Sequence, residues 1–274
     1  TVVRRPARRA GITERARSAT PDGLMTKRTF AIGDLHGDQS ALFRLLSCLP
    51  PLDAENTLVF LGDYLDRGPD SAQVVAYVRE LPRRTAARVV TLRGNHEDAW
   101  LRVVDHGWDP FVLPVGNGCL AAYRSFTGGP PPREDEPPAP EELLSMQRGA
   151  FLPEDVVAWF RSLPFFYEDE HAIYVHAGLP RGGRGFVHPR DVEPKTTLLW
   201  CRDEDFFTSY RGKLCVFGHT RTEYLPEELS AYTPEDPTDL WAGECCVGID
   251  TGAGTGGFLT ALELPAGRVY ESRD

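Results

Sequence analysis

The chain has 274 residues, of which 41% are hydrophobic and 26% charged, and its formal net charge is −10. This composition is typical of a folded globular protein, and its apolar runs are shorter than the roughly 18 residues that a membrane-spanning helix needs. Residues 1–28 hold eight Lys or Arg and two acidic residues, so the rest of the chain carries about −16. So acidic a body repels polyanions, which argues against nucleic acid as a partner.

The N-terminal residues 1–26 are predicted to be a disordered basic tail, and residues 27–274 a single folded domain. The six cysteines show no C-x-x-C pair of the kind that binds zinc. We therefore interpret them as reduced thiols and expect a cytoplasmic location without membrane attachment.

Three strand-loop-helix units follow the tail. Short apolar runs predict strands at Thr29–Ile32, Thr57–Leu61 and Arg88–Leu92. Helices are predicted after each strand, near Ser40–Cys48, after Pro69, and near Glu97–Val104. This order predicts right-handed crossovers and a largely parallel sheet whose loops gather at one edge.

The second half of the chain is less regular. Residues 127–150 include the proline-rich stretch GGPPPREDEPPAP and are predicted to be a surface excursion. A helix near Pro153–Arg161 and strands at Ala172–Val175, Leu214–Phe217, Val247–Ile249 and Gly257–Leu264 follow. The last segments predict a second, mixed or antiparallel sheet. The expected fold is α/β: a four-layer αββα sandwich of two mixed sheets flanked by helices.

Polar motifs stand at the ends of five predicted strands. GDLHG covers Gly33–Gly37, GDYLDRG covers Gly62–Gly68, and RGNHE covers Arg93–Glu97. His176 and His219 come directly after two later strands. Because the loops at the carboxyl ends of parallel strands converge, we expect these side chains to meet in one place.

The ligand-type side chains are sufficient for two metal ions, provided that one carboxylate bridges them. They are Asp34, His36, Asp63, Asn95, His176 and His219. Asp63 is the natural bridge because it lies in the central loop. Carboxylate and imidazole ligands suit Mn²⁺, Fe or Zn²⁺ better than Ca²⁺.

These five ordered motifs, with HAG at 176–178 and GHT at 218–220, resemble the metallophosphoesterases of the calcineurin-like fold. Within that group the sequence is similar to the serine/threonine protein phosphatases of the bacterial and phage branch. The resemblance extends from about Phe30 to Leu264.

The resemblance implies that Asp34 and His36 hold a first metal, that Asp63 bridges, and that Asn95, His176 and His219 hold a second. It implies two divalent ions, expected to be Mn²⁺ with Fe or Zn as alternatives. A water bridging the two ions would attack the phosphorus directly, without a phosphoenzyme.

Further roles follow from the needs of the transition state. Arg67 and Arg202 are expected to clamp the phosphate together with Asn95, since a guanidinium can hold two phosphate oxygens at once. Arg202 lies in a Leu-Trp-Cys-Arg-Asp segment that resembles the family's substrate-arginine segment. His96 is expected to be the general acid, oriented by Asp66.

The expected function is hydrolysis of phosphoserine and phosphothreonine, with phosphotyrosine as a further candidate. The chain would act as a monomer on a phosphorylated protein or a small phosphoester. One alternative is a dinucleoside polyphosphate hydrolase of the Ap4A type on the same metal centre; Asp66 and Arg93 favour the protein phosphatase. A second alternative is a non-catalytic binding module, which predicts missing ligands.

Overall fold

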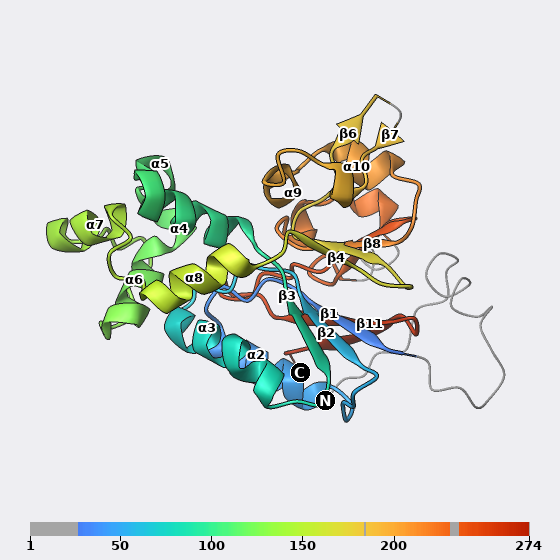
Figure 1. The fold of residues 1–274 in the computed structure, drawn as a ribbon, viewed down its shortest axis with the longest axis horizontal. Coiled ribbons are helices and arrows are strands. Elements are labelled where there is room, and N and C mark those ends of the chain that lie inside the picture. Colours follow the sequence, from blue (N-terminus) through green and yellow to red (C-terminus); the bar gives the residue numbers. More distant parts are fainter. Residues whose placement is uncertain (1–26, 184, 231–235, 274) are drawn as a thin grey trace.

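The computed structural model describes residues 27–183, 185–230 and 236–273. The predicted basic tail, residues 1–26, lies outside the described residues. Two five-stranded sheets form the centre of the molecule, and helices cover their outer faces (Figure 1). Among the described residues, no helix is long and apolar enough to cross a bilayer.

The first sheet has the order β12-β11-β1-β2-β3. Its parallel strands are β1 (Thr29–Ile32), β2 (Thr57–Phe60) and β3 (Arg88–Thr91). Strand β11 (Thr260–Leu264) pairs antiparallel with β1, and β12 (Arg268–Glu271) pairs antiparallel with β11. The sheet is therefore mixed, with three parallel strands and an antiparallel edge.

The second sheet has the order β4-β5-β8-β10-β9. Its central strands β5 (Ile173–Val175), β8 (Cys215–Phe217) and β10 (Cys246–Gly248) are parallel. The edge strands β4 (Phe166–Glu168) and β9 (Trp241–Ala242) are antiparallel to their neighbours. A small hairpin, β6 (Arg181–Gly182) with β7 (Gly185–Phe186), lies outside this sheet.

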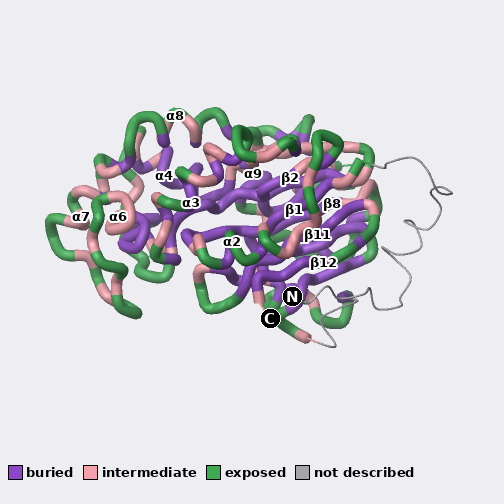
Figure 2. The backbone as a smooth tube through the Cα atoms, turned by 90° about the horizontal axis from the view of Figure 1, so that it is seen from below, coloured by how far each residue is buried: buried purple, intermediate pink, exposed green. Residues whose placement is uncertain are grey.

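Side-chain alternation along the strands builds three apolar layers. In β1, Phe30 and Ile32 pack toward the helices, while Ala31 packs between the two sheets. On the other side of that central layer, Tyr174 and Val216 of the second sheet face the first. The core thus continues through both sheets (Figure 2), which confirms the predicted four-layer αββα sandwich.

Helices occupy both outer faces (Figure 1). Next to the first sheet lie α2 (Gln39–Cys48), α3 (Ser71–Glu80), α4 (Asn95–His106) and α8 (Glu154–Ser162). A helical lobe extends from this layer and contains α5 (Asp109–Val112), α6 (Cys119–Thr127) and α7 (Pro140–Gln147). On the second sheet lie the short helices α9 (Thr197–Trp200) and α10 (Glu204–Ser209).

The structure corrects one prediction. The last two predicted strands do not share a sheet: β10 belongs to the second sheet, whereas β11 returns to the first and pairs with β1, Ile32 opposite Ala261. Alternation of apolar residues defines the buried face of a strand but not its partner. Residues 127–150, predicted to be a surface excursion, contain the helix α7, and Arg124 forms ion pairs with Glu136 and Glu142. All six cysteines are free thiols, as predicted, and four of them are buried.

Candidate metal centre

The candidate site lies where the loops after five strands meet. Backbone hydrogen bonds hold these loops together: the His36 amide donates to the Asp63 carbonyl at 2.8 Å, and the Gly218 amide donates to the His176 carbonyl at 2.8 Å. The His219 amide donates to Asp34 Oδ2 at 3.0 Å, which connects the loops of the two sheets. The strand-end convergence predicted from the sequence is confirmed.

The backbone of this site adopts conformations that side chains normally avoid. Six non-glycine residues among those described have positive φ, and five of them belong to the site motifs: His36, Asp63, Asp66, Arg67 and His219, with φ between 39° and 71°. Left-handed backbone costs a residue with a Cβ free energy and is concentrated at functional sites. Strained loop backbone therefore orients these five side chains.

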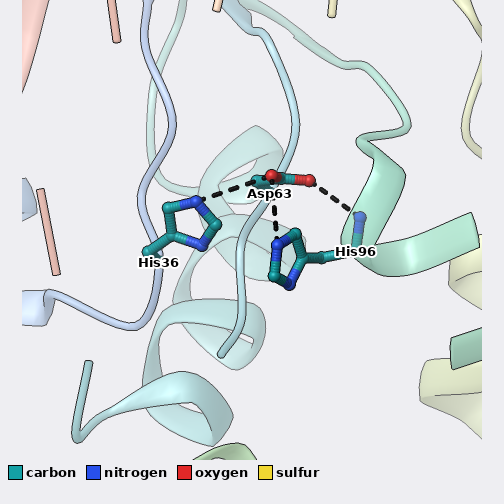
Figure 3. A group of neighbouring side chains, drawn as sticks. All are labelled: His36, Asp63 and His96. Carbon is teal, nitrogen blue, oxygen red and sulfur yellow. Dashed lines mark hydrogen bonds and ion pairs between the residues drawn. The ribbon is translucent and has the colours of Figure 1, made fainter. Parts of the chain in front are cut away.

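Asp63 lies at the centre of the site. Its Oδ2 is 3.5 Å from His36 Nε2 and 3.8 Å from His96 Nε2, and its Oδ1 is 3.5 Å from His176 Nε2. The His96 amide also donates to Asp63 Oδ1 at 3.0 Å. Figure 3 shows His36, from the loop after β1, and His96, from the first turn of α4, approaching Asp63 from two sides. Asp63 thus lies between the two sides of the site, as expected of a bridging ligand.

Asn95 connects the two histidines of the second sheet. Its Oδ1 lies 2.8 Å from His176 Nε2 and 2.8 Å from His219 Nδ1. His176 Nδ1 is 2.9 Å from the Leu61 carbonyl, and donation to that oxygen leaves a lone pair on Nε2. The lone pairs of the Asn95 oxygen and of His176 Nε2 therefore face each other, and a cation bound between them would stabilise this arrangement.

The electrostatics suit a cation. Burial lowers the pKa of His36, His176 and His219, and the neighbouring Arg67 and Arg202 lower the pKa of His36 and His219 further. These shifts favour the neutral imidazole, which is the form that binds metals. Burial alone would raise the pKa of Asp63, but the surrounding histidines hold it well below its usual range, so that carboxylate is ionised.

Asp34 differs from the other predicted ligands. Its Oδ1 is buried without a hydrogen-bond partner among the described residues. Burial, followed by the charges of Asp250 and Asp63, raises the pKa of Asp34 well above its usual value. A buried carboxylate oxygen without a donor is costly unless a cation or proton occupies its lone pair. Asp250, which the sequence analysis did not propose as a site residue, also has a buried Oδ2 without a partner.

Two groups of three side chains have ligand atoms close enough to share an ion: His36, Asp63 and His96, and Asp63, His176 and His219, with all atoms of a group within 4.8 Å. Asp63 belongs to both groups, which fits two cations sharing one carboxylate. His96, predicted to be the general acid, is thus as close to Asp63 as a ligand would be, whereas Asp34 belongs to neither group.

His96 is fixed by a buried carboxylate. Its Nδ1 lies 2.6 Å from Asp66 Oδ2, and Trp100 Nε1 donates to the same oxygen at 2.9 Å. Burial raises the pKa of Asp66, against the opposing effects of His96 and Trp100. With Nδ1 bonded to Asp66, the other ring nitrogen, Nε2, faces Asp63 and Arg67. Trp100 is a supporting residue that no pattern in the sequence singled out.

Glu97 is a second supporting residue that sequence reasoning did not assign. Its carboxylate accepts hydrogen bonds from the backbone amides of Asp63, Tyr64 and Gly94 at 2.8 to 3.0 Å. Burial, with the charge of Asp63, raises the pKa of Glu97 to about 8. Its position directly after His96 was the only available signal. Glu97 holds the loop of Asp63 against the N-terminus of α4.

The two predicted phosphate arginines contact the same histidines. Arg67 NH1 lies 2.6 Å from His36 Nε2, and Arg202 Nε donates to His219 Nε2 at 3.0 Å. Both line a cavity of about 520 Å³ that also contains His219. Each arginine is therefore placed beside one half of the site, with the cavity between them.

The chemistry of these residues fits two divalent cations. The donor set combines neutral imidazoles, an ionised central carboxylate, an amide oxygen and an orphaned carboxylate oxygen. Such mixed nitrogen and oxygen sets suit Mn²⁺, Fe and Zn²⁺. All six predicted ligands lie in one connected cluster of contacts.

The chain is similar to known phosphoesterases. The chain is 28% identical over 151 residues to a symmetrical bis(5'-nucleosyl)-tetraphosphatase of Methylococcus capsulatus, covering 55% of this chain and 43% of that protein. It is 40% identical over 98 residues to the serine/threonine-protein phosphatase SIT4 of Candida albicans, covering 35% and 29%. The chain spans less than half the length of these curated relatives.

A solved structure shows the same fold. A crystal structure whose assignment as a diadenosine tetraphosphatase is provisional superposes with a TM-score of 0.55 at 22% identity, covering 90% of this chain and 93% of that chain. In addition, residues 27–222 match the family model described as "Calcineurin-like phosphoesterase". The chain therefore belongs to the calcineurin-like phosphoesterase family.

Proposed function

We propose that the chain is a dinuclear-metal phosphoesterase that hydrolyses phosphate monoesters, with phosphoserine and phosphothreonine side chains of proteins as its substrates. The observation that carries this proposal is the buried pair of His96 and Asp66 beside the shared carboxylate Asp63. A serine or threonine alkoxide is a poor leaving group and needs a proton, and His96 is placed to donate one.

The metal ligands proposed from the sequence are retained. Asp34 and His36 would hold one ion, Asn95, His176 and His219 the other, and Asp63 both. Two divalent ions supply positive charge for the phosphoryl oxygens and an acidified water as nucleophile. Mn²⁺ is the proposed metal because the ligand set is mixed imidazole and oxygen.

The protein's own residues position and neutralise the phosphoryl group. Arg67 and Arg202 stand on two sides of the cavity and present planar guanidinium groups that can each bind two phosphate oxygens. In the transition state these oxygens carry the negative charge, so fixed cations there stabilise it more than the ground state. Asn95 would contact the phosphoryl group from the side of His176 and His219.

Proton transfer is assigned to His96. Donation from Nδ1 to the Asp66 carboxylate fixes the ring, so that the transferable proton is on Nε2, on the side of Asp63 and Arg67. Trp100 donates to both oxygens of Asp66, at 3.1 and 2.9 Å, and so prevents the carboxylate from rotating away from His96. Protonating the alkoxide completes the cleavage of the phosphate ester.

The protein phosphatase assignment is supported by the 40% identity to the SIT4 phosphatase, over the 98 residues that match. A second candidate, a dinucleoside polyphosphate hydrolase, is supported by the longer match of 151 residues to the Methylococcus capsulatus tetraphosphatase. Both activities would use the same metal ligands, so the substrate distinguishes them.

The test is an activity panel with the purified chain after metal removal and reconstitution with Mn²⁺. The substrates are p-nitrophenyl phosphate, a phosphoserine peptide and diadenosine tetraphosphate. We expect metal-dependent turnover of the first two, with a higher kcat/KM for the phosphopeptide than for the dinucleotide. A dinucleotide preference would reverse the substrate assignment, and no turnover of any substrate would contradict the proposed function.

A further inference from the structure

The cavity beside the metal centre contains a third arginine that the proposed reaction does not use. Arg221 lines the same volume of about 520 Å³ as Arg67 and Arg202. Unlike those two, which contact His36 and His219, Arg221 forms its ion pair with Glu223 and makes no hydrogen bond to a candidate metal ligand among the described residues. A single phosphoryl group at the metals is already served by two arginines.

The charge of this cavity contrasts with the rest of the molecule. Three arginines line it, and Glu204 is the acidic residue among its lining side chains. The chain outside residues 1–28 is strongly acidic. A concentration of positive charge in an acidic surface marks a place built to attract an anion, because charges lining a concave site reinforce one another.

The guanidinium of Arg221 is held in place before any ligand binds. On one side lies Gly252, whose backbone has φ +81 and where an added Cβ would be 3.0 Å from both Nε and NH2 of Arg221. Near it on another side lies the Tyr224 ring, 5.8 Å from the guanidinium carbon to the ring centroid. A group that is already ordered loses less entropy when it binds, so its hydrogen bonds contribute more affinity.

The ion pair that Arg221 already forms leaves it able to bind an anion as well. Arg221 NH2 forms an ion pair with Glu223 Oε1 at 2.8 Å, and these side chains are 30% and 36% exposed. An ion pair this exposed contributes little, typically below about 1 kcal/mol. A guanidinium has five N–H groups in a planar fork, so it can bind an anion while keeping this partner.

The size and edge of the cavity allow for a substrate larger than one phosphoryl group. Its volume falls within the roughly 300 to 1,000 Å³ typical of pockets that enclose drug-sized ligands. Tyr224 and Pro226 line it on the side of Arg221, and Tyr224 is 71% exposed. An exposed aromatic ring next to a cation is a surface on which a planar or apolar group can rest.

We propose that Arg221, held by Gly252 and Tyr224, is a second phosphate subsite, which binds another phosphoryl group of the same substrate while Arg67 and Arg202 hold the scissile one. This rests on the proposed phosphoesterase function. The second phosphoryl group has two possible sources, a neighbouring phosphorylated residue of a peptide or the next phosphate of a phosphoanhydride chain. The shared chemistry is a substrate with two adjacent phosphates.

The test compares substrates that carry one phosphate with substrates that carry more than one. The pairs are a peptide with one phosphoserine against the same peptide with two, and p-nitrophenyl phosphate against diadenosine tetraphosphate. The variants are Arg221→Gln and Arg221→Lys. Arg83→Gln is the matched control, because Arg83 is 77% exposed and forms a similar short-range ion pair with Glu80.

We expect Arg221→Gln to lower kcat/KM about tenfold more for the substrates with several phosphates than for those with one, mainly through KM. This corresponds to the loss of one charge-assisted hydrogen bond. Arg221→Lys should lose less, since it keeps the charge without the fork. The substrate pair that shows the discrimination identifies the source of the second phosphate. Equal losses on all substrates, or the same pattern with Arg83→Gln, would overturn the subsite.

A binding measurement separates this inference from the proposed function. Calorimetry on the Mn²⁺-loaded chain would compare inorganic pyrophosphate with orthophosphate. Arg221→Gln should reduce the preference for pyrophosphate about tenfold, whether or not the chain turns over any ester. An unchanged preference would refute the second subsite while leaving phosphoesterase activity intact. Absence of turnover with a changed preference would refute only the proposed function.

Discussion

Replacing Asp66 by Asn is the sharpest test of the proton-donor role of His96. The change removes the negative charge but keeps a group of the same shape, whose oxygen can still accept from His96 Nδ1 and from Trp100. The protonated imidazole then loses its counter-charge inside a buried site, since both Asp66 and His96 are at most 2% exposed. The ring geometry is expected to persist while proton donation weakens.

The magnitude follows from the geometry of the pair. The two atoms are 2.6 Å apart, and at an effective dielectric constant near 20 unit charges at such a distance attract by about 6 kcal/mol, an upper limit before desolvation is subtracted. Removing one member of a buried pair typically costs about 3 to 5 kcal/mol. A loss of about 3 kcal/mol in the stability of the protonated imidazole lowers the rate of proton donation about 100-fold.

The assay measures kcat with two leaving groups at saturating Mn²⁺. A phosphoserine peptide releases an alkoxide that needs a proton, whereas p-nitrophenyl phosphate releases a phenolate that departs without one. We expect Asp66→Asn to lower kcat about 100-fold on the peptide and less than about tenfold on p-nitrophenyl phosphate. Trp100→Phe is the control, because it removes the donor to Asp66 and leaves the Asp66–His96 pair.

Stability is measured in parallel by thermal unfolding. Because burial raises the pKa of Asp66, the native state does not favour its charge, so Asp66→Asn should lower the melting temperature by less than the loss of a fully charged buried pair would. Trp100→Phe should lower kcat on the peptide less than Asp66→Asn does, because the charged Asp66–His96 pair remains. If Asp66→Asn lowers kcat by the same factor for both leaving groups, Asp66 does not act through proton donation and the reasoning is refuted.

Three further predictions concern the metal ligands, pH dependence and packing. Asn95→Ala should weaken Mn²⁺ binding about 10- to 100-fold by calorimetry, because its oxygen contacts two candidate ligand histidines; undiminished affinity would remove Asn95 from the ligand set. Burial, with the charge of Glu271, raises the pKa of Asp239 from 3.8 to about 6. The folded chain therefore binds more protons than the unfolded chain in that window, and stability falls as pH rises through it, by at most about 3 kcal/mol. Asp239→Asn should raise the melting temperature by a few degrees at pH 8 and leave it nearly unchanged at pH 4; an equal gain at both pH values would contradict this. Gly94→Ala should destabilise the fold by about 1 to 3 kcal/mol and lower activity, because the added Cβ would collide with the Asp63 carboxylate; an unaltered urea midpoint would show that the loop can move aside.

The predicted site came from the position of polar motifs at strand ends. Asp34, Asp63 and Asn95 each follow a strand of the first sheet, and His176 and His219 follow strands of the second. Strand ends are readable because an apolar run stops abruptly at a polar or glycine residue. The convergence of the two sheets' loops then follows from the packing of the sheets.

The parts that could not be predicted depend on long-range pairing. Strand β11 pairs with β1, with Ile32 opposite Ala261. No local pattern in either segment predicts that the two strands pair. Trp100 and Glu97 lie one helical turn apart in α4 and are both buried, so both support the site from the same face of that helix. An amphipathic pattern shows that such a face is buried, but not what it touches.

The left-handed backbone at five site residues has a consequence for the folding stability of the chain. Each such residue costs roughly 1 kcal/mol or more of folding stability relative to glycine. The five residues His36, Asp63, Asp66, Arg67 and His219 together therefore lower the stability of the fold, and they are kept because their side chains form the site. Glycine and asparagine adopt this conformation at lower cost. Glycine at any one of these five positions should therefore raise the melting temperature while it removes a side chain of the site.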